Sequence, residues 1–260
     1  MSDWTGGAVT LRARCVLADN PGPMTLDGTN TWVLREPGAR RCVVIDPGPR
    51  DEGHLRAVHE AAGDVAVVLL THGHPDHAEG AGRFAERAGC PVRALDPVHR
   101  LGTEGLSDGD VVDVDGLELR VVGTPGHTAD SLSFVLSADA ALLSGDTVLG
   151  RGTSVVAHPD GSLDSYLESL RRLRELTERA EVTWVLPGHG PPLDDVLAVV
   201  EYYLRHREER LAQVQEALAT GARTATDVVA RVYADVDRAL WPAAESSVRA
   251  QLAYLSRRGA

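Results

Sequence analysis

The stretch Thr71-His72-Gly73-His74-Pro75-Asp76-His77 places four side chains that can bind a metal within six residues. It directly follows residues 65–70, an unbroken apolar run of strand length. Such a run is typical of a buried strand, so the four side chains are expected on the loop that leaves it. Three histidines and an aspartate at this spacing indicate a metal site rather than an ordinary polar surface loop.

The spacing within this loop suggests two adjacent metals. His72 and His74 are two residues apart, too close for the i, i+4 spacing of a helical zinc site. In an extended loop, however, their side chains point the same way. Asp76 and His77 are offset from that pair, so one loop can serve two metals.

Three more candidate ligands follow strand-like segments. His127 comes after residues 117–122, Asp146 follows the apolar run around 142–143, and His189 comes after residues 182–185. Each is framed by glycine, which permits tight turns and close backbone approach. Four strand-end sites of the same design indicate one shared cleft.

This pattern, HxHxDH with a downstream His, Asp and His, resembles the metallo-β-lactamase superfamily. The resemblance implies an αββα sandwich of two mixed sheets with a dinuclear metal site at one edge. Carried over by position, the first metal would be held by His72, His74 and His127, the second by Asp76, His77 and His189, and both by a bridging Asp146. Such donors suit Zn²⁺ best, with Mn²⁺ or Fe²⁺ as alternatives, so two Zn²⁺ per chain are expected.

The resemblance also implies hydrolysis by a hydroxide that bridges the two metals. Asp146 stands where zinc β-lactamases that destroy antibiotics typically have Cys, and His74 stands where oxygen-reducing diiron members have Glu. What remains is glyoxalase II-like thioesterases, lactonases and RNA-cleaving phosphodiesterases, which share one ligand set. Asp76 is expected both to bind the second metal and to orient the nucleophile as a general base would.

Composition bears on compartment and partners. The formal net charge is −12 and all 26 basic residues are Arg. An acidic chain repels polyanions at long range, which counts against an extended nucleic-acid groove but not against a short single-stranded RNA at the metals. No apolar run is long enough to cross a bilayer, the first residues lack a signal-peptide pattern, and the three cysteines lack CxxC spacing. A cytoplasmic location without membrane attachment is therefore expected.

Two domains are predicted, a metallo-β-lactamase-like catalytic domain at 1–190 and a small all-α domain at 191–260. The first shows strand patterns at 8–18, 31–35 and 42–46 and helix patterns at 51–62, 78–88 and 164–179. The second shows helix patterns at 194–219, from 224 or 226, and at 243–257. These last helices and residues 20–31 resemble the winged-helix-bearing branch of the lactamase-like endoribonuclease, near the fungal polyketide thioesterases. After the last helix, too few residues follow for a full wing.

Residues outside the ligand set receive simpler interpretations. Arg151, Thr153 and Ser154 follow the bridging aspartate closely and are the candidates for substrate contact. The other residues of interest are expected to have structural or surface roles. His54, His59 and His206 are expected on the surface, His99 and His158 in loops, Cys42 in the core, and Tyr202, Tyr203 and Arg205 in helix packing or a lid.

The leading hypothesis is a dinuclear zinc hydrolase. Full-length resemblance favours an endoribonuclease-type phosphodiesterase, whereas the acidic charge favours a small thioester or ester. A DNA-binding regulator is the weaker alternative, because residues 243–258 offer only Arg249, Arg257 and Arg258 for a recognition face. Residues 191–260 are instead expected to roof the cleft or to contact a second subunit of a homodimer.

Overall fold

The computed structural model describes residues 4–259, and its first sheet contains six strands in sequence order. The strands are β1 (Gly7–Ala8), β2 (Ala13–Leu17), β3 (Asn30–Leu34), β4 (Cys42–Ile45), β5 (Val65–Leu69) and β6 (Val92–Arg93). The strands from β1 to β4 pair antiparallel, and β4, β5 and β6 pair parallel. The carboxyl end of β5, where the histidine-rich loop begins, therefore lies inside the sheet rather than at its edge strand.

The second sheet has the order β11-β10-β9-β8-β7. Its strands are β7 (Val111–Val114), β8 (Leu117–Gly123), β9 (Leu132–Leu136), β10 (Ala141–Gly145) and β11 (Trp184–Pro187). Only β10 and β11 pair parallel, and the chain between them passes through α4 (Leu163–Glu178). Parallel neighbours need such a crossover, because a tight hairpin can join only antiparallel strands.

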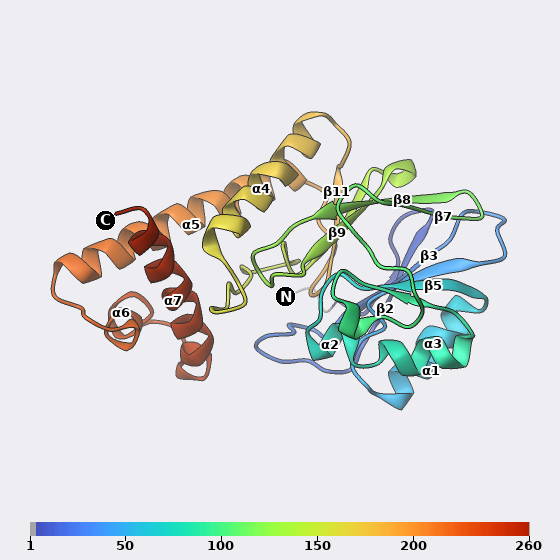
Figure 1. Ribbon diagram of the computed structural model, residues 1–260, viewed down its shortest axis with the longest axis horizontal. Helices are drawn as coiled ribbons and strands as arrows, with labels where there is room; N and C mark the ends of the chain where they lie inside the picture. Colours follow the sequence, from blue (N-terminus) through green and yellow to red (C-terminus); the bar gives the residue numbers. More distant parts are fainter. Residues whose placement is uncertain (1–3, 260) are drawn as a thin grey trace.

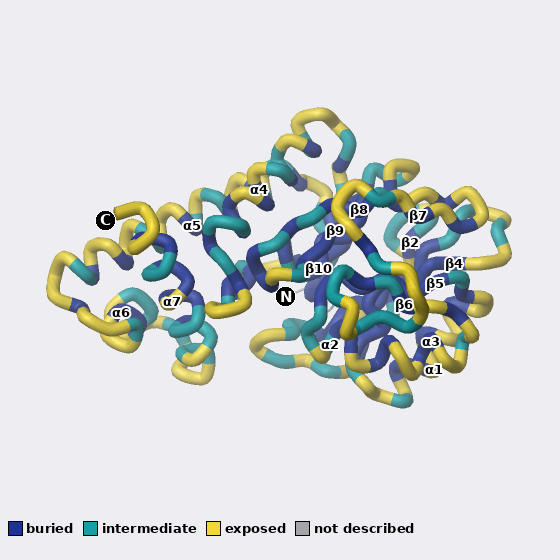
Figure 2. The backbone as a smooth tube through the Cα atoms, in the orientation of Figure 1, coloured by how far each residue is buried: buried dark blue, intermediate teal, exposed yellow. Residues whose placement is uncertain are grey.

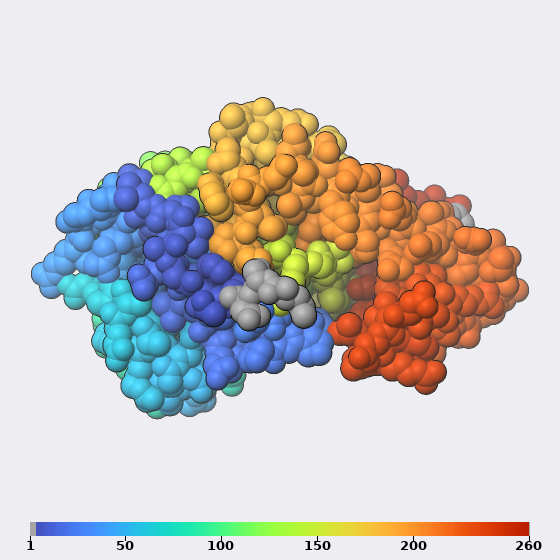
Figure 3. All heavy atoms as spheres, turned by 180° about the vertical axis from the view of Figure 1, so that it is seen from behind, coloured from blue at the N-terminus to red at the C-terminus, as the bar shows by residue number. Residues whose placement is uncertain are grey.

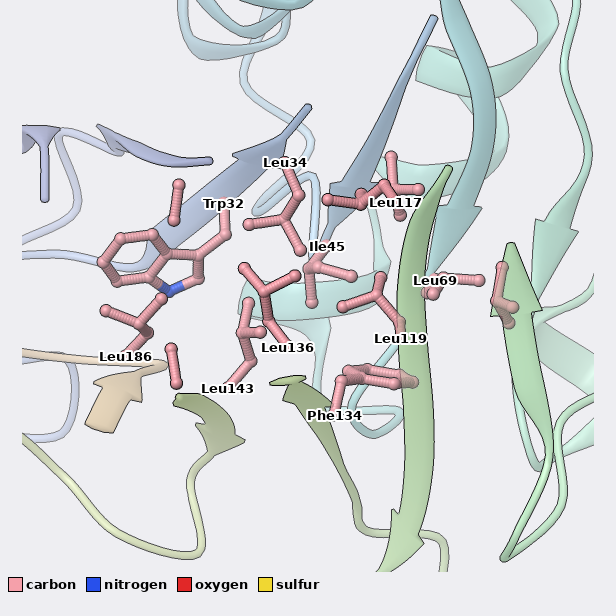
Figure 4. Packing of buried hydrophobic residues seen from close by; sticks show 14 of the residues in the cluster. Trp32, Leu34, Ile45, Leu69, Leu117, Leu119, Phe134, Leu136, Leu143 and Leu186 are labelled. Carbon is pink, nitrogen blue, oxygen red and sulfur yellow. The ribbon is translucent and has the colours of Figure 1, made fainter. Parts of the chain in front are cut away.

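The main core lies between the two sheets (Figure 4). Side chains of alternate strand residues point to opposite faces of a sheet, so Val43 and Ile45 face the second sheet while Cys42 and Val44 face outward to helices. Cys42 is buried, as expected from the sequence. The labelled inter-sheet residues are Trp32, Leu34, Ile45, Leu69, Leu117, Leu119, Phe134, Leu136, Leu143 and Leu186.

Helices cover the outer faces of both sheets, which confirms the αββα architecture (Figure 1). The helices α1 (Glu52–Ala62) and α3 (Ala81–Ala88) pack on the first sheet through Leu55 and Phe84. On the second sheet, α4 and the start of α5 (Val196–Ala219) pack through Tyr166 and Tyr203. Figure 2 shows the resulting pattern, with buried strands and helices whose outer faces are exposed.

Beyond the sandwich, three helices share a core of their own. The helices are α5, α6 (Ala225–Val232) and α7 (Trp241–Arg257), and Thr224 caps α6 with Asp227 in a capping box. Their core also includes Leu163 and Leu167 of α4, so it is joined to the sandwich. Since α5 contributes to both cores, one continuous helix connects them, and the predicted boundary at 190/191 stays a prediction. Between residues 194 and 259 the chain forms no strand.

Two predicted elements differ from the structure. The strand expected at 8–18 is β1 followed by β2, because a turn closed by the Val9 N–H on the Ala13 carbonyl at 3.0 Å separates them. The helix expected at 78–88 begins earlier, as α2 (Pro75–Ala78), and resumes as α3 after a break at 79–80. None of the helices in the described part of the chain is both long enough and apolar enough to cross a membrane.

Candidate metal centre

Four segments of the chain bring the seven predicted ligands together at one edge of the sandwich. The loop after β5 and the first turn of α2 carry His72, His74, Asp76 and His77, and the loops after β8, β10 and β11 carry His127, Asp146 and His189. Backbone hydrogen bonds hold these segments side by side: Leu132 N–H donates to the Thr71 carbonyl at 2.8 Å, and Gly188 N–H donates to the Gly145 carbonyl at 2.9 Å.

The side chains form two groups, divided as the resemblance implies. One group contains His72, His74, His127 and Asp146, and within each group the donor atoms lie within 4.8 Å of one another. His74 Nδ1 lies 3.0 Å from His72 Nε2 and 3.1 Å from His127 Nε2. Three imidazole nitrogens therefore converge on one point.

The second group contains Asp76, His77 and His189. His189 Nε2 lies 3.2 Å from His77 Nε2 and 3.1 Å from Asp76 Oδ2. Asp146 lies between the two groups: its Oδ1 is 3.4 Å from His77 Nε2, and its Oδ2 is 3.4 Å from His189 Nε2 and 3.6 Å from His127 Nε2. A carboxylate in this position can contact two metals at once.

The donor set fits metal ions better than it fits a purely organic site. Tetrahedral zinc–nitrogen bonds place neighbouring donors about 3.3 Å apart, and the distances given above cluster around that value. Asp146 Oδ1 is buried without a hydrogen bond, which is costly unless another partner exists. Five imidazoles with two carboxylates are donors of the kind that borderline-soft divalent metals prefer.

Asp46 supports the second group and was missed as a functional residue at the sequence level. Its Oδ2 lies 2.9 Å from His77 Nδ1 and accepts from the Thr71 hydroxyl at 2.6 Å, while its Oδ1 accepts from Thr71 N–H at 2.8 Å. A carboxylate on the far ring nitrogen fixes the tautomer and orientation of a ligating histidine. The only sequence signal was an acidic residue at the end of β4 followed by Pro-Gly.

Two of the other histidines, His127 and His189, are oriented by backbone carbonyls at their far ring nitrogens. Nδ1 of His127 lies 2.6 Å from the Val155 carbonyl, and Nδ1 of His189 lies 3.0 Å from the Gly28 carbonyl. Asn30 secures the His189 loop, because its side-chain amide donates to the carbonyls of Pro187 at 2.9 Å and Gly190 at 2.8 Å. The N-terminal segment 20–31 therefore helps to hold the centre.

Gly188 is required by close approach. A Cβ at this position would lie 2.4 Å from Asp146 Oδ1 and 2.8 Å from His77 Cε1. Real Cβ atoms do not approach other atoms so closely, so any side chain here would displace the aspartate that lies between the two groups. This contact explains the glycine before His189.

In the metal-free site, burial and neighbouring charges lower the pKa values of some side chains and raise those of others. Burial drives the pKa of His72 well below its usual value. Burial also opposes charge on His77, but the carboxylates of Asp76 and Asp146 raise its pKa well above the usual value. For His189, burial is likewise outweighed by Asp146, and the pKa rises to about 9. Burial disfavours charge on Asp146, yet His189 and His77 lower its pKa.

Metal binding is therefore expected to release protons at neutral pH. The raised pKa values keep His77 and His189 protonated in the metal-free protein, whereas a metal binds neutral imidazole. Affinity should therefore rise with pH up to about 9, above which His189 is already neutral in the metal-free protein. Calorimetric titrations in two buffers of different ionisation enthalpy measure the release, and identical heats in both buffers would contradict it.

A cavity of about 300 Å³ opens beside the centre, and His127 and Asp146 form part of its wall. The three predicted substrate-contact residues, Arg151, Thr153 and Ser154, line it as well. Arg151 is ion-paired with Asp27, and Ser154 is buried with its Oγ 3.2 Å from His127 Nδ1. The cavity is thus continuous with the candidate metal centre.

The wall opposite the sandwich comes from the N-terminal segment and the C-terminal helices. Met24 and Leu26 contribute from residues 20–31, and the helical part contributes His206, Arg207, Arg210, Tyr233, Val236, Leu240, Ala243, Ala244 and Ser247. In Figure 3 the blue N-terminal segment, the orange α5 and the red C-terminal helices approach one another around this region. Residues from His206 to Ser247 thus contribute one side of the pocket.

Two of the five histidines outside the ligand set are not where the sequence suggested. His54 is buried, because its Nε2 lies 2.8 Å from the Thr31 hydroxyl beneath the Pro47-Gly48 turn. His206 is half-buried and lines the cavity. His59 and His158 are exposed, in agreement with the sequence, and His99 lies in a short turn beside Gly73 of the histidine-rich loop.

The neighbouring tyrosines of α5, Tyr202 and Tyr203, differ in burial. Tyr203 is buried and accepts a hydrogen bond from Leu149 N–H at 2.9 Å, which confirms the packing interpretation for this residue. Tyr202 is exposed, and Arg205 is ion-paired with Glu201 on the same helix. Tyr203 therefore anchors the loop after β10, and the α5 residues that line the cavity are His206, Arg207 and Arg210.

Comparison with known families agrees with the geometry. Residues 24–189, more than half of the chain, match the Metallo-beta-lactamase superfamily. The chain belongs to this superfamily. Residues 224–260 match the Beta-lactamase associated winged helix domain, which covers α6 and α7. Membership, together with the His/Asp groups, makes this metallo-β-lactamase fold protein a metal-dependent hydrolase.

Individual relatives extend over nearly the whole chain. The Beta-lactamase-like protein 2 homolog of Caenorhabditis elegans is 33% identical over 256 residues, covering 94% of this chain and 84% of the relative. Atrochrysone carboxyl ACP thioesterase of Aspergillus fumigatus is 32% identical over 238 residues, covering 84% and 72%. The crystal structure of a metallo-beta-lactamase family protein from Thermus thermophilus is 25% identical with a TM-score of 0.81, covering 97% and 96%.

Proposed function

We propose that this chain is a dinuclear zinc hydrolase whose substrate is a small thioester or ester. The observation that carries the proposal is the cavity of about 300 Å³ that reaches His127 and Asp146 and is closed on its other side by apolar residues of the C-terminal helices. Sites of roughly 300–1,000 Å³ with apolar walls and a few polar groups are typical for small molecules.

The seven grouped side chains are the proposed ligands. His72, His74 and His127 would hold the first metal, and Asp76, His77 and His189 the second, with Asp146 shared between them. When bound, two zinc ions would make a water molecule acidic enough to attack at neutral pH and would stabilise negative charge on the substrate oxygen.

Asp76 is proposed to orient the attacking water in addition to its ligand role. Its side chain is 27% exposed, whereas those of His77 and His189 are almost fully buried, so Asp76 is the member of its group that water reaches. The Thr29 hydroxyl donates to its Oδ2 at 3.2 Å and fixes one carboxylate oxygen. The other oxygen is then free to accept a proton or a hydrogen bond from the water.

Three considerations favour a small substrate over RNA. The net charge of −12 repels a polyanion at long range, and the cavity is of small-molecule size. A relative is also named a thioesterase, Atrochrysone carboxyl ACP thioesterase. Short single-stranded RNA, the other substrate predicted from the sequence, is the competing hypothesis in the assay below.

The structure also counts against the DNA-binding alternative. Arg249 is ion-paired with Glu245 on α7, and Arg257 is ion-paired with Asp164 of α4. Two of the three arginines that a recognition helix would need for phosphates and bases are therefore engaged with carboxylates of this chain. A homodimer stays a prediction from the sequence.

A metal-content measurement combined with a substrate panel tests the proposed function. Protein purified without chelator should contain close to two zinc equivalents by elemental analysis, as a two-metal site requires. The loaded protein should hydrolyse small acyl thioesters or esters faster than lactones or short RNA. Active protein without metal would refute the metal centre, and cleavage of RNA alone would refute the substrate class.

A further inference from the structure

Two arginines of α5 line the cavity on the side away from the sandwich. Arg207 and Arg210 are three residues apart, so they share one face of the helix. The same cavity reaches Asp146 and His127 of the candidate metal centre. The candidate metal centre and the two arginines therefore border the same cavity.

Arg207 is buried without a counter-ion. Its side chain lies over the ring of Tyr166 with 4.9 Å between Cζ and the ring centroid, and one terminal nitrogen donates to the Ser154 carbonyl. Its Nε has no hydrogen-bond partner. Among residues 4–259, no carboxylate oxygen lies within the 4.0 Å of an ion pair with it.

Arg210 also lacks a counter-ion, although it is only half-buried. It donates to the Gln213 side-chain oxygen at 3.0 Å and to the Val232 carbonyl at 3.1 Å, and it lies over the ring of Tyr233 at 4.6 Å. Both hydrogen bonds go to neutral acceptors. Within the part of the chain that the structure describes, Arg210 likewise forms no ion pair.

The third arginine of the cavity behaves differently, as do the arginines nearby on the helices. Arg151 is ion-paired with Asp27, Arg205 with Glu201, and Arg249 with Glu245. His206, which precedes Arg207 in the chain, adds no positive charge: burial and then the charges of Arg207 and Arg210 lower its pKa to about 4. The carboxylate that lines the cavity, Asp146, lies beside His77 and His189 and forms no ion pair with either arginine. Arg207 and Arg210 are therefore the cationic side chains of the cavity without an ion-pair partner among the described residues.

An unpaired charge in a buried position is costly, and natural proteins normally pair it or use it to bind a ligand. This chain has 38 acidic residues and only 26 basic ones, so a lack of carboxylates does not explain the missing partner. Guanidinium groups bind planar carboxylates and phosphates with two parallel hydrogen bonds. The missing partner is then expected to be an oxyanion brought by the ligand.

We propose that Arg207 and Arg210 form an oxyanion-binding subsite, and that the substrate carries a carboxylate or phosphate at a distance from the bond that is hydrolysed. The inference rests on the proposed function for the identity of the reacting bond. In a thioester the oxyanion has two possible sources: a carboxylate on the acyl half, or a phosphate on the thiol half. Apolar residues line the same cavity, among them Leu149, Val236 and Leu240, and they suit the carbon chain that would join the oxyanion to the reacting bond.

Matched thioesters distinguish the two sources. The acyl arm compares glutaryl-N-acetylcysteamine with its neutral terminal amide, and the thiol arm compares butyryl-4′-phosphopantetheine with butyryl-pantetheine. We expect KM to be about ten- to a hundredfold lower for the charged member of one arm, the range for hydrogen bonds to a charged group. Arg210→Gln and Arg207→Gln should bring that ratio close to one. Arg207→Lys should recover only part of it, because an ammonium lacks the bidentate geometry.

Arg205→Gln is the matched control. It removes the same charge from the same helix, but Arg205 is exposed and does not line the cavity, so the KM ratio should remain that of the wild-type protein. Arg207 also donates a hydrogen bond to the Ser154 carbonyl, so its replacement can unfold the protein. In that case the KM ratio of the Arg210→Gln variant tests the proposal. A wild-type ratio near one in both arms overturns the proposal. So does a preference that survives Arg210→Gln and Arg207→Gln.

A binding measurement separates failure of the inference from failure of the proposed function. Glutarate and 4′-phosphopantetheine are titrated into the zinc-loaded protein by calorimetry, whether or not any thioester is hydrolysed. Since a carboxylate can also bind the metals, only affinity that disappears in Arg210→Gln and persists in Arg205→Gln supports the subsite. If no thioester reacts but one ligand shows this loss, the proposed reaction is wrong and the subsite stands. If neither ligand shows it, the subsite is wrong.

Discussion

Replacing Asp146 with alanine is expected to remove most of the bound metal and to abolish hydrolysis. Asp146 is the residue whose two oxygens contact both groups of histidines, at 3.4 to 3.6 Å, so its loss affects both metal positions. Loss of the metals removes several kcal/mol of transition-state stabilisation, which corresponds to a decrease in kcat of about a thousandfold or more. Elemental analysis and steady-state kinetics measure the two effects on the same sample.

Two further variants sharpen this experiment. Asp146→Asn keeps the shape but loses the charge and one ligand oxygen, so its metal content should lie between those of wild type and Asp146→Ala. Asp113→Ala removes an exposed aspartate from β7 of the same sheet and should change neither quantity. Full metal content and full activity in Asp146→Ala would show that Asp146 is not a shared ligand.

Asp76→Ala is expected to lower kcat by about a hundred- to ten-thousandfold, the contribution of a positioned general base. The first metal should be retained, because its proposed ligands His72, His74 and His127 lie in the other group. The combination of one remaining metal with lost turnover separates a role in chemistry from simple collapse of the site. Metal analysis, together with a thermal denaturation curve of the variant, provides the structural half of the comparison.

The control for Asp76 lies three residues further along the chain. Glu79 is an exposed acidic residue at the end of the same short helix and belongs to neither metal-binding group, so Glu79→Ala should behave like wild type. Turnover of Asp76→Ala equal to that of wild type on the same substrate would remove Asp76 from the mechanism. Loss of both metals would instead assign it a purely structural role.

The comparison between sequence and structure is informative around Asp46 and His77. The histidine was predicted as a ligand because it belongs to a recognisable spaced motif in one loop. The aspartate that orients it at 2.9 Å lies 31 positions earlier and has no motif of its own. Only the parallel pairing of β4 with β5 brings the ends of these strands together and reveals the contact.

The sequence alone predicted an element correctly where the residues that determine it lie in one short segment. The apolar run at 65–70 determined a buried strand, because both of its faces pack against side chains of the core. The sequence predicted that α6 begins at Thr224 or Thr226, and the structure selects Thr224, because its side chain and that of Asp227 satisfy nearby backbone groups. The superfamily could likewise be inferred from six residues of one loop and three later positions.

Only the tertiary structure shows which side chains are buried and which charged groups have an ion-pair partner. His54 looked exposed from its place on a helix, but it is buried because the turn at Gly48 and Thr31 of a distant strand cover it. Arg205 and Arg207 are indistinguishable by type and by neighbourhood in the sequence, yet one is ion-paired and exposed and the other is buried without a counter-ion. Such differences arise from long-range packing, since residues far apart in the chain determine the environment of each charge.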